Sequence, residues 1–167
     1  MFPQAGSESN ESRWLLKALR EAAHELDAQL WGLDEADLRW RPSDDGWSLK
    51  EIAAHLRDCE EHFLQSLEAI ALEHEPRIAA LDADALVLER DYREIDIYDT
   101  LEQLSDMRQR AVMILWQEDW QREGRHQYLG PVSIARLARD QSHHDLEHLW
   151  QARRLREALA ERAPAPQ

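Results

Sequence analysis

The stretch WSLKEIAAHLRD, residues 47–58, decides the fold because it marks where a long helix begins and which of its faces is buried. Ser48 and Glu51 within it form an S-x-x-E capping box, the pair that closes the first turn of a helix. Apolar residues then recur every three or four positions, as one buried helix face requires. This stripe comprises Leu49, Ile52, Leu56, Phe63, Leu67 and Ile70. We predict a helix over residues 49–73.

Three further segments, residues 12–33, 97–118 and 133–162, have the same helical periodicity. Their expected inward positions are Leu15, Ala18, Leu19, Ala22, Leu26, Leu30 and Leu33 in the first, Ile97, Leu101, Leu104, Ala111, Ile114 and Leu115 in the second, and Ile134, Leu137, Gln141, His144, His148, Ala152, Leu155 and Leu159 in the third. No strand-like alternation of useful length occurs. Four amphipathic helices predict an all-α four-helix bundle.

Prolines and a long connection outline the domain. Residues 75–96 form a long crossover between the second and third bundle helices, and residues 79–90 within it could form a short helix. We expect one domain over residues 12–162, flanked by disordered segments at residues 1–11 and 163–167. A chain of about 150 residues buries roughly 70% of its unfolded surface, which suffices for a core without staples.

The charge balance excludes several classes of partner. The 167 residues include 20 Lys and Arg against 34 Asp and Glu, a net charge of −14. Nucleic-acid backbones and anionic membranes are bound through Lys and Arg, so neither partner is expected. No apolar run is long enough for a membrane helix, and the first residues lack the features of a signal peptide. We expect a soluble, cytoplasmic protein.

Histidines supply the clearest chemical signal. His144 and His148 lie four residues apart, so both project from one helix face, in register with the apolar stripe. Two imidazoles at this spacing can share a metal ion, although a hydrogen-bonded network with carboxylates would also satisfy them. His55, at the edge of the stripe in residues 49–73, is a third candidate ligand. Cys59, the single cysteine, excludes a disulfide and could compete as a ligand or be a small buried residue.

Other polar residues near these histidines have weaker signals. Asp145, Glu147 and Glu51 could accept hydrogen bonds from imidazole N–H groups, or could be ordinary surface charges. His143 is rotated about 100° from His144 around the helix and should point elsewhere. The string HDLEH, residues 144–148, fits an inverted metallopeptidase motif, but only a short tail follows it. The string EAAH, residues 21–24, has no second E-x-x-H, which a di-iron bundle needs.

Tryptophan is frequent, with 7 residues, and two of them flank the loop before the second bundle helix. Trp40 and Trp47 are expected to plug the end of the bundle. The alternative is that they form a wall of a ligand pocket.

Taken together, these segments resemble the DinB/YfiT-like family of metal-binding four-helix bundles. Residues 40–42 (WRP) and 47–58 are similar to the W-S-x-x-E-x-x-x-H-L-x-D stretch that opens the second helix of the family. Residues 130–133 (GPVS) and 140–151 (DQSHHDLEHLWQ) are similar to its final helix. The resemblance covers about residues 12–159. It implies that His55, His144 and His148 form a metal triad for Zn²⁺, Ni²⁺ or another divalent ion, in a chain that is often dimeric.

The resemblance also frames the function. Some members resemble enzymes that join or transfer low-molecular-weight thiols, and others are described as hydrolases. Our first hypothesis is therefore a metal-dependent enzyme acting on a small-molecule substrate, foremost a low-molecular-weight thiol S-transferase and alternatively a hydrolase, with Glu147 or Asp58 as guessed bases. The second is a non-catalytic stress-response or dimerisation module whose metal is closed by a fourth ligand such as Cys59. The third is a metal-free bundle with a buried polar network.

Overall fold

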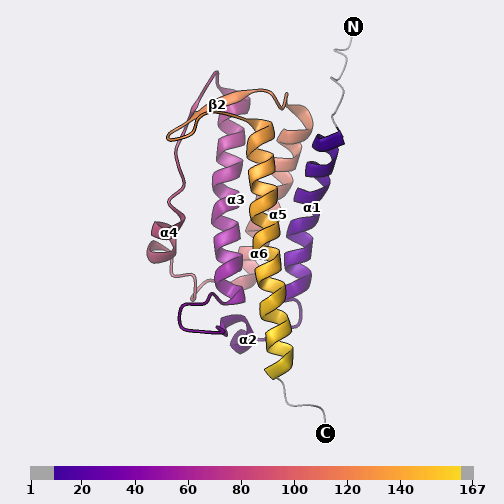
Figure 1. The fold of residues 1–167 in the computed structure, drawn as a ribbon, viewed down its shortest axis with the longest axis vertical. Coiled ribbons are helices and arrows are strands. Elements are labelled where there is room, and N and C mark those ends of the chain that lie inside the picture. Colours follow the sequence, from indigo (N-terminus) through magenta and orange to yellow (C-terminus); the bar gives the residue numbers. More distant parts are fainter. Residues whose placement is uncertain (1–9, 163–167) are drawn as a thin grey trace.

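The computed structural model describes residues 10–162, which form a four-helix bundle with a small sheet at one end (Figure 1). The elements are α1 (Asn10–Leu30), α2 (Glu35–Arg39), α3 (Leu49–Leu72), β1 (Arg77–Ile78), α4 (Ala83–Glu89), α5 (Ile97–Gln117), β2 (Glu123–His126), β3 (Gly130–Ser133) and α6 (Ile134–Arg162). The predicted disordered segments lie outside the described residues, apart from Asn10 and Glu11, which open α1.

The four long helices α1, α3, α5 and α6 form the bundle. Helix α3 packs against α5 and α6, and α1 packs against the same two helices, so α1 and α3 occupy opposite corners. Helices α1 and α6 run in one direction and α3 and α5 in the other (Figure 1). The crossover between Leu72 and Ile97 makes this arrangement, because it returns the chain to the end where α3 began. The predicted all-α bundle with a long crossover is confirmed.

Local sequence explains where the helices begin and end. Ser48 and Glu51 form the predicted capping box at the start of α3, with both reciprocal hydrogen bonds present. Asp96 caps α5 by accepting from two backbone N–H groups of the first turn. Helix α1 ends at Leu30, before the expected Leu33, because Gly32 adopts a φ of +78°, which a helix does not allow.

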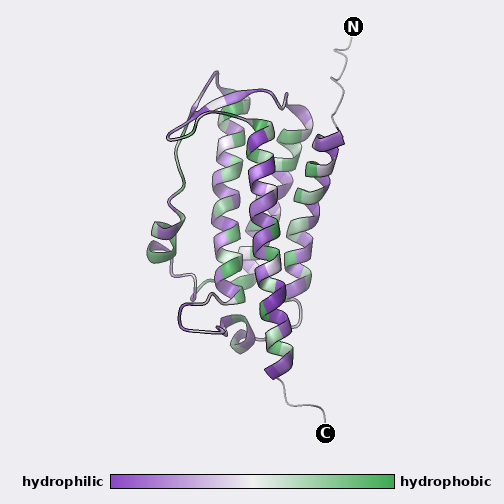
Figure 2. Cartoon of the chain, in the orientation of Figure 1, coloured by the Kyte–Doolittle hydropathy of each residue, from purple (hydrophilic) through white to green (hydrophobic). Residues whose placement is uncertain are grey.

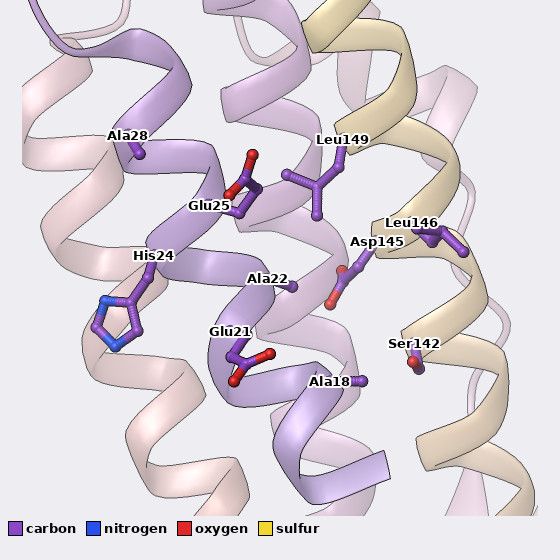
Figure 3. Close-up of a pocket in the computed structure, with 10 residues that line it drawn as sticks. All are labelled: Ala18, Glu21, Ala22, His24, Glu25, Ala28, Ser142, Asp145, Leu146 and Leu149. Carbon is purple, nitrogen blue, oxygen red and sulfur yellow. The ribbon is translucent and has the colours of Figure 1, made fainter. Parts of the chain in front are cut away.

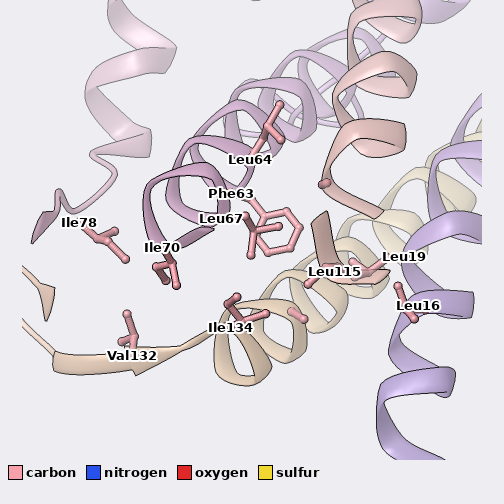
Figure 4. Packing of buried hydrophobic residues seen from close by; sticks show 12 residues of the cluster. Leu16, Leu19, Phe63, Leu64, Leu67, Ile70, Ile78, Leu115, Val132 and Ile134 are labelled. Carbon is pink, nitrogen blue, oxygen red and sulfur yellow. The ribbon is translucent and has the colours of Figure 1, made fainter. Parts of the chain in front are cut away.

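Two apolar clusters fill the bundle, one at each end. Figure 2 shows hydrophobic residues recurring along the long helices, and Figure 4 shows the cluster beside the sheet. The cluster beside the sheet comprises Leu16, Leu19, Phe63, Leu64, Leu67, Ile70, Ile78, Ala111, Leu115, Val132, Ile134 and Ala138. The other comprises Leu26, Leu30, Leu38, Leu49, Ile52, Ala53, Leu56, Ile97, Leu104, Ala152, Leu155 and Leu159. A buried polar layer lies between them, and Arg108 of α5 is at its centre. The candidate site lies at the same level of the bundle.

Three short strands, which the sequence analysis did not predict, cover one end of the bundle. Strand β2 pairs parallel with β1 and antiparallel with β3, and β3 leads directly into α6. Ile78 and Val132 point from the strands toward Ile70 of α3 (Figure 4). Gly124 lets β2 approach this cluster, because a Cβ there would lie 2.6 Å from Cδ1 of Ile78. Strands of four residues or fewer are too short to produce an alternating pattern.

The predicted short helix at residues 79–90 corresponds to α4, and α2 was not predicted. Within residues 10–162, none of the helices combines the length and the apolar character needed to cross a lipid bilayer.

Candidate metal centre

Three histidines from α3 and α6 converge at the level of the buried polar layer. The Nε2 atoms of His55 and His144 lie 2.9 Å apart. The ring of His148 is centred 4.6 Å from the ring of His55 and 4.6 Å from that of His144. One ligand atom from each histidine lies within 4.8 Å of the others, and among the described residues these three form the group suited to a metal ion. The structure therefore brings together all three predicted ligands.

Helix geometry explains this convergence. His144 and His148 stand one turn apart on the same face of α6, as their spacing predicts. His55 lies in the α3 segment that packs on α6, and the antiparallel course of these helices sets it opposite the pair. His55 is only 7% exposed, and His144 and His148 are half-buried. The site is thus carried by two rigid helices and needs no loop to complete its nitrogen donors.

Burial favours the neutral form of His55 and His144, which is the form of imidazole that binds metal. Desolvation, together with the nearby His148 and His144, lowers the pKa of His55 from 6.5 to about 4. Desolvation also lowers the pKa of His144, with a second contribution from His148. Three imidazoles facing one another would repel if they were protonated. The lowered pKa values of His55 and His144 favour their neutral form near pH 7, and only neutral imidazole offers a lone pair to a metal.

The residues present fit a divalent ion. Imidazole nitrogens bind zinc at about 2.0–2.1 Å, so two of them on one tetrahedral ion lie about 3.3 Å apart, somewhat farther than the 2.9 Å between the two Nε2 atoms. Nδ1 of His148 donates to Oε1 of Gln151 at 2.9 Å, which leaves its Nε2 free as a ligand. Nδ1 of His144 is buried and has no hydrogen-bond partner among the described residues. Within the histidine cluster itself, no carboxylate balances these donors.

Trp47 forms one wall of the site. Its ring meets His55 edge-on at 4.9 Å between centroids and stacks against His148 at 6.0 Å with 9° between the planes. Trp40 and Trp47 both pack against the apolar cluster at that end of the bundle, as expected for residues that plug it, and Trp40 also lies 4.6 Å from the guanidinium of Arg162. Only Trp47 contacts the histidines as well.

Cys59 touches the site but does not complete it. Its Sγ lies 3.6 Å from Nε2 and 3.9 Å from Nδ1 of His55. Nearly equal distances to both ring nitrogens place the sulfur beside the imidazole, away from the direction of either lone pair. Burial raises the pKa of this thiol to about 12, so it is held protonated. The ligand group formed by the described residues contains the three histidines and not Cys59.

The expected supporting carboxylates have other partners. Asp145 turns into the bundle and lies 2.8 Å from Nη1 of Arg108, and Glu51 binds Arg41 and the Ser48 cap. Glu147 is exposed on α6. The residue that supports a ligand is Gln151, which the sequence analysis missed. Its position one turn after His148, on the same face of α6, was the available signal.

Two further residues near the histidines, the guessed base Asp58 and His143, lie outside the ligand group. Asp58 is buried and accepts hydrogen bonds from the hydroxyl of Tyr92 at 2.6 Å, from Arg90 at 2.7 Å and from Arg57 at 2.8 Å. The contacts with Arg90 and Tyr92 tie the crossover to α3, so Asp58 anchors the crossover. His143 is exposed and lies outside the group, as its rotation predicts.

Comparison with known proteins agrees with this geometry. A family model described as the DinB superfamily matches residues 18–152, most of the described chain. The chain belongs to the DinB superfamily. This match includes His55, His144, His148 and Gln151. A search of curated proteins returned no match.

A solved structure of YfiT from Bacillus subtilis shares the fold of this DinB-superfamily chain. It is described as a probable metal-dependent hydrolase with an unusual four-helix bundle topology. The TM-score is 0.82 at 16% sequence identity, over 96% of this chain and 94% of YfiT. At this identity the match establishes the common fold, and the resemblance stated from the sequence is confirmed.

Proposed function

We propose that this chain is a metal-dependent hydrolase whose divalent ion, zinc or nickel, is held by His55, His144 and His148. The observation that carries the proposal is the convergence of three ligand atoms within 4.8 Å, from imidazoles on two rigid helices. Three protein ligands with an open position are typical of catalytic sites, whereas structural zinc sites have four. The description of YfiT as a probable metal-dependent hydrolase supports the same reading.

The chemistry follows from the donor set. A divalent ion in such a site would supply Lewis acidity and lower the pKa of a water or thiol that it binds. Gln151 holds His148 in the tautomer that leaves Nε2 free. Trp47 covers one side of the imidazoles and restricts the approach of water there. Since Cys59 lies beside His55 and Asp58 is held by three donors, neither side chain closes the open position.

Thiol transfer is the second candidate. A substrate thiol would use the same open position, and the thiolate is the nucleophile in such transfers. The hydrolase leads because the structural match carries that description. The proposed substrate is in either case a small molecule.

One experiment separates the candidates. The protein is dialysed against a chelator, reloaded with zinc or nickel, and assayed with p-nitrophenyl acetate and, separately, with cysteine plus monochlorobimane. A hydrolase gives ester cleavage that rises with metal content, and a transferase gives metal-dependent thioether formation. His144→Ala should abolish either activity, whereas His143→Ala, one residue away but exposed, should retain it. Equal rates in the stripped and loaded protein would overturn the proposal, and bound metal without turnover on either probe would favour a non-catalytic module.

A further inference from the structure

A second concave feature lies on the other side of α6 from the histidines. It is a hollow of about 610 Å³ between α1 and α6. Ala18 and Ala22 point into it from α1, and Leu149 and Asp145 face them from α6 (Figure 3). The small alanine side chains leave the space open, and the lining is mainly apolar. Its volume lies within the range of about 300–1,000 Å³ found for ligand pockets.

The charged groups that line the hollow are all carboxylates, and one of them, Glu21, also lies 3.7 Å from Nζ of Lys17 outside the lining. Glu21 and Glu25 line it from α1 and are exposed, while Asp145 is only 4% exposed and lies deep between the helices. His24 also belongs to the lining but points away from α6 (Figure 3). No lysine or arginine is among the residues that line it.

The deep carboxylate shares its cation with a second carboxylate. Oδ1 of Asp145 accepts from Gln141 at 3.1 Å, and Oδ2 is ion-paired with Nη1 of Arg108 at 2.8 Å. Arg108 also binds both oxygens of Glu60, so a single guanidinium serves two carboxylates. Two carboxylates and one guanidinium, a formal charge of −1, therefore lie beneath the apolar lining of the hollow.

We propose that this hollow binds a small organic ammonium ion with an apolar body. The alanines and Leu149 contact the apolar part, and the carboxylates of Glu21, Glu25 and Asp145 face the charge. A second copy of this chain fits less well, because it would bring further acidic groups from a molecule of net charge −14. The inference does not depend on the metal centre, since no histidine of the triad lines the hollow.

The test is a titration of the metal-stripped protein with n-hexylammonium, followed by amide chemical shifts in NMR spectra. Hexanol and hexanoate, which have the same apolar body, are the neutral and anionic comparators. We expect saturable shifts around Ala18, Ala22 and Leu149. The ammonium should bind about three- to tenfold more tightly than hexanol, as expected for a few partly exposed charge contacts, and hexanoate most weakly.

Variants assign the two parts of the site. The double substitution Glu21→Gln and Glu25→Gln should lower hexylammonium binding toward that of hexanol and leave hexanol unchanged. Ala18→Phe fills the hollow from an exposed position and should abolish both, whereas Ala160→Phe, exposed on α6 outside the hollow, should change neither. Shifts elsewhere, equal binding of all three probes, or an Ala18→Phe protein that binds as well as wild type would overturn the proposal. So would a dimer in sedimentation that Ala18→Phe dissociates, because a second copy would then occupy the hollow.

Discussion

Two polar clusters lie side by side in the middle of the bundle. One pairs opposite charges, and the other brings together three side chains of the same kind. Around Arg108, the guanidinium binds Glu60 through two hydrogen bonds of 2.9 and 2.6 Å and reaches Asp145 at 2.8 Å. Around His55, three like groups face one another with no opposite charge in the cluster. The two clusters adjoin in sequence, because Asp145 follows His144.

The difference shows which cluster needs a ligand. A buried charge that is paired with protein groups needs no further ligand in the folded chain. Removing one partner of the pair therefore lowers the free energy of unfolding. The Nε2 atoms of His55 and His144 are at hydrogen-bond distance from each other, but a single cation can bind all three converging imidazoles at once. We therefore expect substitutions in the first cluster to change stability and substitutions in the second to change metal binding.

The largest effect is expected from Arg108→Met. This change leaves the carboxylates of Glu60 and Asp145 buried without their cation, and breaking a buried pair costs about 3–5 kcal/mol. Urea unfolding of the metal-free protein measures the change in the free energy of unfolding. Arg110→Met is the matched control, because the pair of Arg110 with Glu68 is on the surface, and its loss should cost less than about 1 kcal/mol. Equal losses in the two variants would show that the Arg108 cluster is not the stabilising one.

A smaller effect is expected from pH. The pKa of His55 is about 4 in the folded chain against 6.5 for an unperturbed histidine. Between these values the unfolded chain binds a proton that the folded chain does not, so metal-free stability falls as the pH drops from 6.5 toward about 4. The contribution of His55 is on the order of 2–3 kcal/mol. Urea midpoints across this window should fall less steeply for His55→Gln than for wild type, and parallel curves would refute the assignment.

The sequence analysis identified His55 as a candidate site residue, but it did not identify Arg108. The periodicity predicted the helix that carries His55 and the one that carries His144 and His148, because one-turn spacing determines the face of a helix. Arg108 was missed, although it lies in the buried stripe between Leu104 and Ala111. An isolated arginine there gives no sign of its partners, since Glu60 and Asp145 come from other helices. The periodicity of one helix predicts which face is buried, but it does not predict which residues of other helices contact that face.

The surroundings of the triad were predictable only in part. The roles of Asp58, Asp145 and Glu51 were misassigned, because sequence distance shows which turn a carboxylate occupies but not whether an arginine or a tyrosine reaches it first. The short strands were also missed, since pairing and not local pattern defines them. The sequence analysis also did not predict the hollow between α1 and α6. Ala18 and Ala22 match the apolar stripe, yet they line an open space.

The smallest effect is expected from Gln151. Replacing it with Leu removes the acceptor of the His148 Nδ1 proton, and loss of such a partner typically weakens metal affinity by about 10- to 100-fold. Competition with a chromophoric chelator measures the affinity, and Gln151→Glu should restore most of it because a carboxylate also accepts this proton. Gln109→Leu, on the exposed side of α5, serves as the control. An unchanged affinity in Gln151→Leu would mean that His148 does not depend on this bond.

The most direct test of the metal centre is the amount of metal bound per chain, measured by plasma mass spectrometry after loading with zinc or nickel and exhaustive dialysis. Wild type and His143→Ala should each retain one divalent ion per chain. His55→Ala, His144→Ala and His148→Ala should each fall to background while keeping their helical circular dichroism. Metal-free wild type, or full occupancy in His144→Ala, would contradict the account.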